Sequence, residues 1–136
     1  MTDSTAFEET THDIRVTVRA FFLAEQSDAE KSHFVWAYRV RIANLGGRRV
    51  RLLKRTWMIT DGMGRTQRLH GEGVVGETPV LPPGGSFEYT SGTPLPTPSG
   101  FMRGIYHMVD LDSAEPFDIA VPAFSLDSPH QPGGLH

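Results

Sequence analysis

The sequence predicts an all-β protein, an immunoglobulin-like or fibronectin type III-like β-sandwich of about seven or eight antiparallel strands. Three observations predict this fold class. Apolar and polar side chains alternate in segment after segment, as in a strand that buries one face. Turn residues separate these segments, since the chain contains 14 glycines and 10 prolines. No segment shows the apolar spacing of an amphipathic helix.

The first two predicted strands, 14–22 and 34–42, alternate most regularly. Their apolar positions would face the core, and a turn at 44–47 would follow the second strand, because Asn and Gly tolerate the backbone conformations of tight turns. Their polar face carries Arg15, Thr17, Arg19, His33, Arg39 and Arg41.

A change of phase predicts a β-bulge in the next strand, 50–61. Val50 and Leu52 lie on one parity, whereas Leu53, Trp57 and Ile59 lie on the other. One extra residue shifts every later side chain to the opposite face of a strand. We therefore expect a bulge at Leu52–Leu53.

The later strands are more polar or richer in turn residues. The segment 65–75 suits a sheet edge, and a turn at 81–85 separates it from the strand 86–91. Prolines within 94–98 exclude a central strand, because proline lacks the backbone N–H that a ladder requires. We expect this segment to cross between the sheets. The last strands are expected over 101–110 and 116–124.

One domain is expected over residues 12–126, between a flexible N-terminus (1–11) and a flexible C-terminal tail (127–136), because both ends contain little to bury. The N-terminus lacks the apolar core of a signal peptide, and no apolar run approaches the about 20 residues that span a bilayer. The absence of cysteine excludes disulfides and Cys-ligated zinc and is typical of a reducing compartment. We expect a soluble cytoplasmic protein without a membrane partner.

Blocks of sequence within residues 12–126 resemble the bacterial ApaG family, and together they extend over nearly the whole predicted domain. They are EQSD (Glu25–Asp28), ANLGG (Ala43–Gly47), LLKRTWMITD (Leu52–Asp61), GEGVVGETPVLPPGGSFEYTSGTPLPTPSG (Gly71–Gly100), YHMVD (Tyr106–Asp110) and VPAFSL (Val121–Leu126).

This resemblance implies a fibronectin type III-like sandwich, but little chemistry. Some family members are encoded beside a diadenosine tetraphosphate hydrolase, and some are linked to cobalt and magnesium resistance. Related domains in eukaryotic F-box and polymerase-associated proteins imply protein–protein contact. The chain departs from the family at Arg48, Arg49 and Arg51, where acidic or neutral residues are usual, and at Phe101, where a small residue is usual.

Gly71, Gly73 and Gly76 match the pattern G-x-G-x-x-G, which binds pyrophosphate when a helix follows, because the helix N-terminus offers unpaired N–H groups. Here Glu77 and Pro79 follow, without helical periodicity and without a lysine. We therefore expect the glycines to be structural, permitting positive φ or a close approach of two backbones.

Basic residues are concentrated in the span 39–68. Of the 13 lysines and arginines, nine lie there with a single acid, Asp61. Because consecutive strands usually lie side by side, the span predicts a cationic sheet face that attracts nucleotides, nucleic acid or acidic proteins. The alternative is a solvated face that opposes aggregation. The predicted anion- or partner-binding surface is Arg48, Arg49, Arg51, Lys54 and Arg55.

No pattern predicts a metal, a cofactor or a catalytic site. Asp110, Asp112 and Glu115 begin like a calcium loop, but an oxygen ligand and a glycine are missing from the positions that need them. The 6 histidines show no metal-binding spacing. Neither a nucleophile elbow nor a P-loop occurs, so we do not expect an enzyme.

We predict a non-catalytic binding module of the ApaG type with a protein partner. Two alternatives stay open: a nucleotide- or polyanion-binding protein linked to diadenosine polyphosphate metabolism, and an accessory factor in magnesium and cobalt homeostasis. The oligomeric state is also open, because strand edges at 65–70 and 51–57 could pair with a second copy to form a homodimer.

Overall fold

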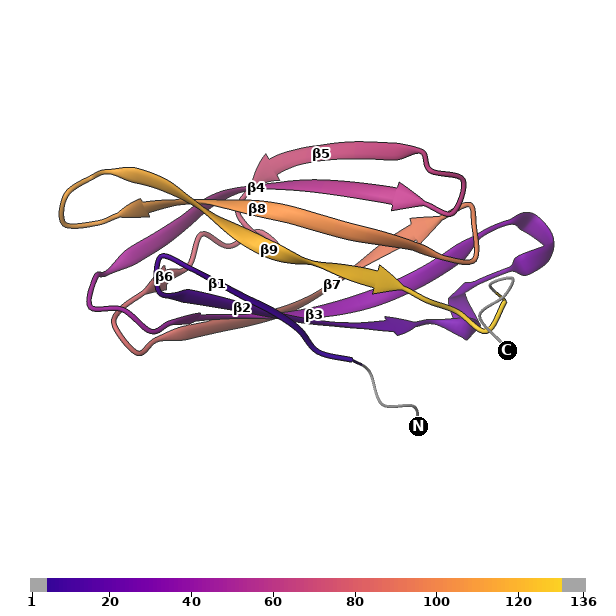
Figure 1. Cartoon of the computed structure of the whole chain (residues 1–136), viewed down its shortest axis with the longest axis horizontal. Helices are drawn as coiled ribbons and strands as arrows, with labels where there is room; N and C mark the ends of the chain where they lie inside the picture. Colours follow the sequence, from indigo (N-terminus) through magenta and orange to yellow (C-terminus); the bar gives the residue numbers. More distant parts are fainter. Residues whose placement is uncertain (1–4, 131–136) are drawn as a thin grey trace.

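A computed structural model describes residues 5–130, which form two antiparallel β-sheets. Figure 1 shows the sheets as two stacked layers. Two short 3₁₀ helices, η1 (Ala24–Gln26) and η2 (Ala29–Lys31), lie between the second and third strands. The strands are β1 (Phe7–Thr11), β2 (Ile14–Phe22), β3 (Phe34–Asn44), β4 (Val50–Asp61), β5 (Thr66–Glu72), β6 (Val80–Leu81), β7 (Ser86–Leu95), β8 (Gly100–Asp110) and β9 (Pro116–Leu126).

The strand order confirms the predicted all-β sandwich. The four-stranded sheet has the order β1-β2-β3-β7, and the five-stranded sheet has the order β5-β4-β8-β9 with β6 paired to β4. All strand pairs are antiparallel. The proline-rich segment 94–98 does lead from one sheet to the other, because β7 and β8 lie in different sheets. Pro94 itself lies in β7, an edge strand, where a missing N–H is tolerated.

The core lies between the inner faces of the sheets and follows from the alternation of the sequence. Ile14, Val16 and Val18 of β2 are at most 1% exposed, and the alternate residues of β2 point to solvent or lie at the surface. Trp36 of β3 is buried opposite Phe22 in the strand register. Burial of such apolar surface is the main stabilising contribution to the fold.

The predicted bulge in β4 is confirmed. The pairing of β4 with β8 shifts between Leu52 and Lys54, which leaves Leu53 without a partner in the ladder. Trp57 and Ile59 beyond the bulge are buried as their parity predicts, but the inward position expected for Leu53 is wrong, because Leu53 is itself the bulged residue and its side chain is exposed. The bulge therefore turns the second half of β4 so that its aromatic and aliphatic residues face the core.

The expected flexible N-terminus over 1–11 is wrong for residues 7–11, which form β1. This strand pairs with β2 from Phe7↔Val18 to Thr11↔Ile14, and Phe7 packs against the core. Hydrogen bonds to β2 satisfy the backbone N–H and C=O groups of this polar segment. Such backbone pairing does not require an apolar pattern of side chains, so nothing in the sequence indicated the strand. Residues 1–4 lie outside the described part of the chain.

The expected flexible tail over 127–136 is wrong for 127–130, which pack on the sandwich. Nε1 of Trp36 donates a hydrogen bond to the backbone carbonyl of Asp127 (2.8 Å). A buried indole N–H requires such an acceptor, so the core itself holds this segment in place. Residues 131–136 lie outside the described part of the chain.

The predicted single cationic face over 39–68 is wrong, because β3 and β4 lie in different sheets. Arg39 and Arg41 belong to the four-stranded sheet, whereas Lys54, Arg55 and Arg68 belong to the five-stranded sheet. The chain crosses from one sheet to the other after β3. Basic residues before and after this crossing are therefore on different sheets, although they are close in sequence.

Candidate functional site

An open groove of about 270 Å³ lies where the edge strands β5 and β7 approach one another. On the opposite side of the sandwich, β9 contacts β1 and β2. Tyr38 and Tyr89 line the groove from the four-stranded sheet, and Trp57, Ile59 and Leu69 line it from the five-stranded sheet. The groove is therefore a gap between two sheet edges, with apolar and aromatic walls.

Two tyrosines, Tyr38 and Tyr89, line the groove, and Tyr89 is hydrogen-bonded to a third, Tyr106. The hydroxyls of Tyr89 and Tyr106 are joined by a hydrogen bond of 2.5 Å, and Tyr106 is fully buried. Burial raises the pKa of Tyr38, Tyr89 and Tyr106, an effect that the nearby Arg55 guanidinium opposes. Because these pKa values lie above the ordinary value, the hydroxyls are neutral at physiological pH and can donate hydrogen bonds.

Arg55 contributes a positive charge to the groove. Its Nη1 donates to the backbone carbonyls of Glu72 (2.8 Å) and Gly73 (2.8 Å). Among residues 5–130, no carboxylate forms an ion pair with this guanidinium. Arg55 therefore anchors the glycine segment and keeps its formal charge uncompensated.

The glycine segment forms a tight turn beside the groove. Gly73 has φ +59° and Gly76 has φ +81°, while Gly71 lies against the Arg55 side chain. The N–H of Gly73 donates to the carbonyl of Leu53 (2.7 Å), and strand β6 follows the turn. The Gly73 amide already has an acceptor and no helix follows, so the geometry favours the structural interpretation of the three glycines over a phosphate cradle.

The five basic residues predicted as a binding surface have partners within the protein. Nη1 of Arg48 lies 3.1 Å from Oδ2 of Asp110, Nη2 of Arg49 lies 3.7 Å from Oδ1 of Asp112, and Nζ of Lys54 lies 3.9 Å from Oε2 of Glu72. Nε of Arg51 donates to the carbonyl of Thr78 (3.0 Å). Three of these charges are thus balanced by carboxylates, and Arg51 and Arg55 bind carbonyl oxygens.

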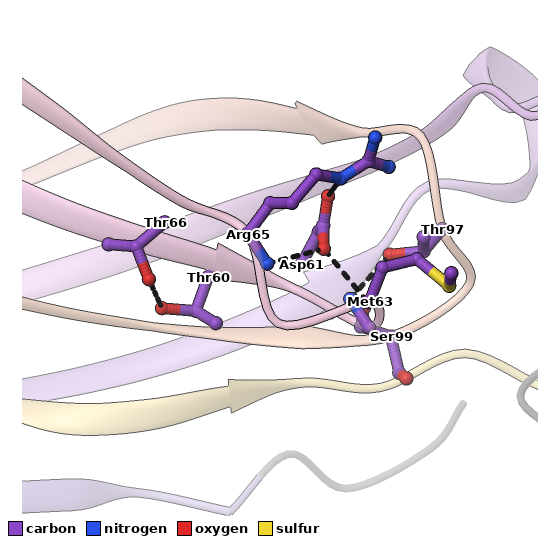
Figure 2. Close-up of polar contacts among 8 residues, drawn as sticks. Thr60, Asp61, Met63, Arg65, Thr66, Thr97 and Ser99 are labelled. Carbon is purple, nitrogen blue, oxygen red and sulfur yellow. Dashed lines mark hydrogen bonds and ion pairs between the residues drawn. The ribbon is translucent and has the colours of Figure 1, made fainter.

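A tight turn between β4 and β5 fixes the start of β5, and Figure 2 shows its polar contacts. Oδ1 of Asp61 accepts from the N–H groups of Met63 (2.8 Å) and Arg65 (3.1 Å), and its Oδ2 accepts from Nε of Arg65 (3.0 Å). Burial alone would raise the pKa of Asp61, but these hydrogen bonds lower it below the ordinary value. Thr97 of the β7–β8 turn accepts from the N–H of Gly62 (2.8 Å), which joins the two connections.

A similar turn surrounds Asp110 at the end of β8. Oδ1 of Asp110 accepts from the N–H groups of Asp112 (2.9 Å) and Ser113 (3.2 Å). These two hydrogen bonds, assisted by the Arg48 guanidinium, lower the pKa of Asp110 below its ordinary value. The residues that resemble a calcium loop therefore form a hairpin turn in which the carboxylate already has donors.

Asp110→Asn should lower the free energy of unfolding at neutral pH and weaken its dependence on acid. A lowered folded-state pKa adds stability above the ordinary value of 3.8, and this stability is lost as the pH falls through the lower folded value. Urea unfolding at neutral pH and at about pH 3 measures both effects. Asp112→Asn is the matched control, because that side chain is 71% exposed. Equal acid dependence in Asp110→Asn and wild type would contradict the prediction.

A hydrogen-bonded chain across the outer face of the five-stranded sheet was not predicted. Oγ1 of Thr56 lies 2.8 Å from Nδ1 of His70 and 2.8 Å from Nε2 of His107. Nδ1 of His107 lies 2.8 Å from Oδ1 of Asp118. The four residues come from β5, β4, β8 and β9, so no sequence spacing connects them.

A hydroxyl, an imidazole and a carboxylate follow one another in Thr56–His107–Asp118, as in a hydrolytic triad. The hydroxyl, however, is not accessible to a substrate. Thr56 is 2% exposed, whereas a nucleophile has to reach its substrate. Its hydroxyl also carries a single proton and interacts with two imidazole rings. The chain therefore suits a cross-strand structural role.

Neither a metal cluster nor a membrane-spanning helix is found in residues 5–130. No group of three or more His, Cys, Asp or Glu is placed there to hold a metal ion. No helix in this range is long and apolar enough to cross a membrane.

The fold and groove define a class of protein: a small β-sandwich whose accessible cleft lies between two sheet edges. A sequence model of the ApaG domain matches residues 24–110. Protein ApaG of Paramagnetospirillum magneticum is 62% identical over 125 residues, which cover 92% of this chain and 95% of the relative. Protein ApaG of Rhodospirillum centenum is 60% identical over 124 residues, covering 91% and 95%. The chain belongs to the ApaG family.

Solved structures agree with this assignment. A crystal structure from Bordetella pertussis, described as that of an ApaA protein, matches with a TM-score of 0.83 and 45% sequence identity. The match covers 90% of this chain and 98% of that chain. The likeness thus extends over most of this chain and nearly all of that chain.

Proposed function

We propose that the chain is a non-catalytic binding module that holds an extended segment of a protein partner in the groove between β5 and β7. One observation carries the proposal: both walls of the groove are edge strands with a free side, next to exposed apolar residues. A partner segment that pairs with such an edge gains backbone hydrogen bonds and directs alternate side chains into the adjacent cleft.

Strand β5 is the better edge for this pairing. It contains no proline, whereas β7 contains Pro94, which cannot donate a hydrogen bond. The exposed apolar residues Leu69 (44%) and Val75 (53%) both line the groove. Pairing with β5 would therefore cover apolar surface that is otherwise exposed to water.

The charge of the groove indicates the chemistry of the partner segment. Arg55 lines the groove and forms no ion pair with a carboxylate of the described residues. A segment with alternating apolar side chains and one acidic side chain complements this arrangement, because the carboxylate can bind the unused donors of the guanidinium. The proposal involves no reaction and places the module in the cytoplasm.

Leu69→Glu should weaken partner binding by at least about tenfold, because it puts a charge into the apolar contact. Random peptides displayed on phage are selected on the wild-type protein, and calorimetry with one synthesised peptide then measures the affinity. Leu45→Glu is the matched control, since Leu45 is 56% exposed and lies outside the groove. Hydrogen exchange should show protection of β5 amides by the peptide. Equal weakening in both variants, or protection confined to other strands, would refute the groove as the binding site.

A further inference from the structure

The outer face of the four-stranded sheet carries a second group of basic residues, separate from the groove. Strands β2 and β3 are neighbours in the lower layer of Figure 1. Arg19 lies directly opposite Arg39, and Arg41 lies opposite Thr17 in the register. These residues alternate with buried ones, so they point away from the core. The arginine face, as we call it, consists of Arg15, Arg19, Arg39 and Arg41.

Three arginines of this face, Arg15, Arg39 and Arg41, differ from basic residues such as Arg48 and Lys54, which form ion pairs with carboxylates. Among residues 5–130, no carboxylate forms an ion pair with Arg15, Arg39 or Arg41. An anionic ligand can therefore bind these three guanidinium groups without displacing a carboxylate of the described residues from an ion pair.

Acidic residues flank this face on the outer strands. Glu8 of β1 lies opposite Thr17, and Glu88 of β7 lies opposite Arg41. Both would repel a negatively charged ligand from the edges of the sheet. The favourable path for a polyanion therefore runs lengthwise along β2 and β3.

An aromatic side chain lies at one end of this path. Phe21 of β2 is opposite Ala37, which is opposite Gly92, so small residues continue its row across the sheet. The guanidinium carbon of Arg39 lies 5.9 Å from the centroid of the Phe21 ring. An aromatic ring beside small residues and next to a cation is a surface on which a nucleobase can stack.

We propose that the arginine face binds single-stranded nucleic acid, with phosphates on Arg15, Arg39 and Arg41 and one base stacked on Phe21. Alternate residues of a strand are about 7 Å apart, so the basic groups form a regular row of phosphate-binding positions. A flat sheet does not enter the grooves of a duplex, whereas open sheet faces with aromatic residues bind unpaired bases. This site is independent of the peptide groove.

Fluorescence anisotropy with a labelled oligouridylate and with a duplex of the same length tests the proposal. The single strand should bind more tightly than the duplex. With three or four phosphates contacted, affinity should fall by about 20- to 50-fold between about 50 and 200 mM salt. Absence of binding at the lower salt, or equal affinity for the duplex, would overturn the proposal.

Three variants separate this site from a general effect of charge. Replacing Arg39 and Arg41 together by Gln should lower the affinity at least about tenfold and reduce the logarithmic salt slope by about 1.4. Phe21→Ala should weaken binding by about tenfold without changing the slope. The matched control replaces Arg49 and Arg51 by Gln, which removes the same charge at the start of β4 and the residue before it, away from the arginine face, and should change affinity less than about twofold.

Three results would contradict these expectations. An equal loss in the control variant would mean that only net charge matters. Binding that is insensitive to Phe21 and equally strong for polyglutamate would assign the face to an acidic protein instead. Chemical-shift mapping of the wild-type protein with the oligouridylate gives a test without substitutions, since β2 and β3 amides should shift and groove residues should not. Shifts confined to the groove would refute the site.

Discussion

Gly73→Ala is expected to destabilise the fold by about 2–4 kcal/mol. Gly73 has φ +59°, and a Cβ there would lie 2.3 Å from the backbone carbonyl oxygen of Glu77. That oxygen accepts the N–H of Val74 (2.8 Å), whose side chain is fully buried in the core. The methyl group therefore has to displace backbone that positions a core residue, so no side-chain rotation can relieve the clash.

The other two glycines of the motif serve as matched controls, and alanine substitutions there should destabilise the fold progressively less. Gly76 has φ +81°, but a Cβ there would meet no atom within 4 Å, so Gly76→Ala should cost about 1 kcal/mol through backbone strain alone. At Gly71 a Cβ would meet only the end of the Arg55 side chain, at 3.0 Å. Urea unfolding should rank the losses in the order Gly73, Gly76, Gly71. A loss at Gly73 no larger than that at Gly76 would contradict the steric explanation.

The same variants test whether the motif holds phosphate. Each protein is melted with and without ATP, ADP and diadenosine tetraphosphate. If the glycines are structural, these ligands should leave the melting temperature of the wild type unchanged, because ligand binding to the folded state would raise it. A ligand-induced rise that the alanines abolish, with normal melting in the absence of ligand, would show that the glycines bind phosphate.

Trp57→Ala is expected to lower the free energy of unfolding by about 3–5 kcal/mol, as for other large-to-small core substitutions of aromatic residues. Trp57 is 4% exposed and connects the two layers. Its ring centroid lies 5.5 Å from that of Tyr38 in the four-stranded sheet. It also lies 6.2 Å from Tyr106 and 6.1 Å from Phe124 in the five-stranded sheet. Truncation removes these edge-on contacts and leaves a cavity that surrounding strands cannot fill without shifting.

Two controls make the Trp57 prediction specific. Trp57→Phe keeps an aromatic ring between Tyr38 and Phe124 and should lose clearly less stability than the alanine variant. Met58→Ala changes the next residue, which points to the outer face and is only partly buried, so its effect should be about 1 kcal/mol or less. Urea unfolding of the three variants measures the differences. A loss below about 1 kcal/mol for Trp57→Ala would contradict its role as the link between the sheets.

Local alternation predicted which residues of β2 and β3 face the core. Ile14, Val16 and Trp36 are buried as their parity predicts, and the parity change after Leu52 correctly located the bulge. Strand β1 was not predicted, because its side chains, FEETT, do not alternate. The strand exists because β2 offers it a free backbone edge. Side-chain patterns carry no information about such an available edge.

The candidate site was less accessible to sequence reasoning, because it depends on which strands become neighbours. The groove combines Tyr38, Arg55 and Leu69 from three strands in two sheets. The basic residues next to one another in sequence, such as Arg48 and Arg49, have carboxylate partners from the distant β8–β9 hairpin. The sequence suggested that these charges were unpaired, because their carboxylate partners lie about 60 residues further along the chain.

By itself, the sequence determined the all-β class, the parity of most strands, the position of the bulge and the family resemblance. The fold class, the parity and the bulge depend on the period of side chains along a strand and on short-range backbone preferences. Both can be recognised in a few adjacent residues. The tertiary structure alone decided that Arg19 faces Arg39, that β3 and β4 lie in different sheets and that β5 and β7 leave a groove. Strand order and sheet closure are set by which apolar faces pack together across the whole domain, and this packing joins residues that no local pattern connects.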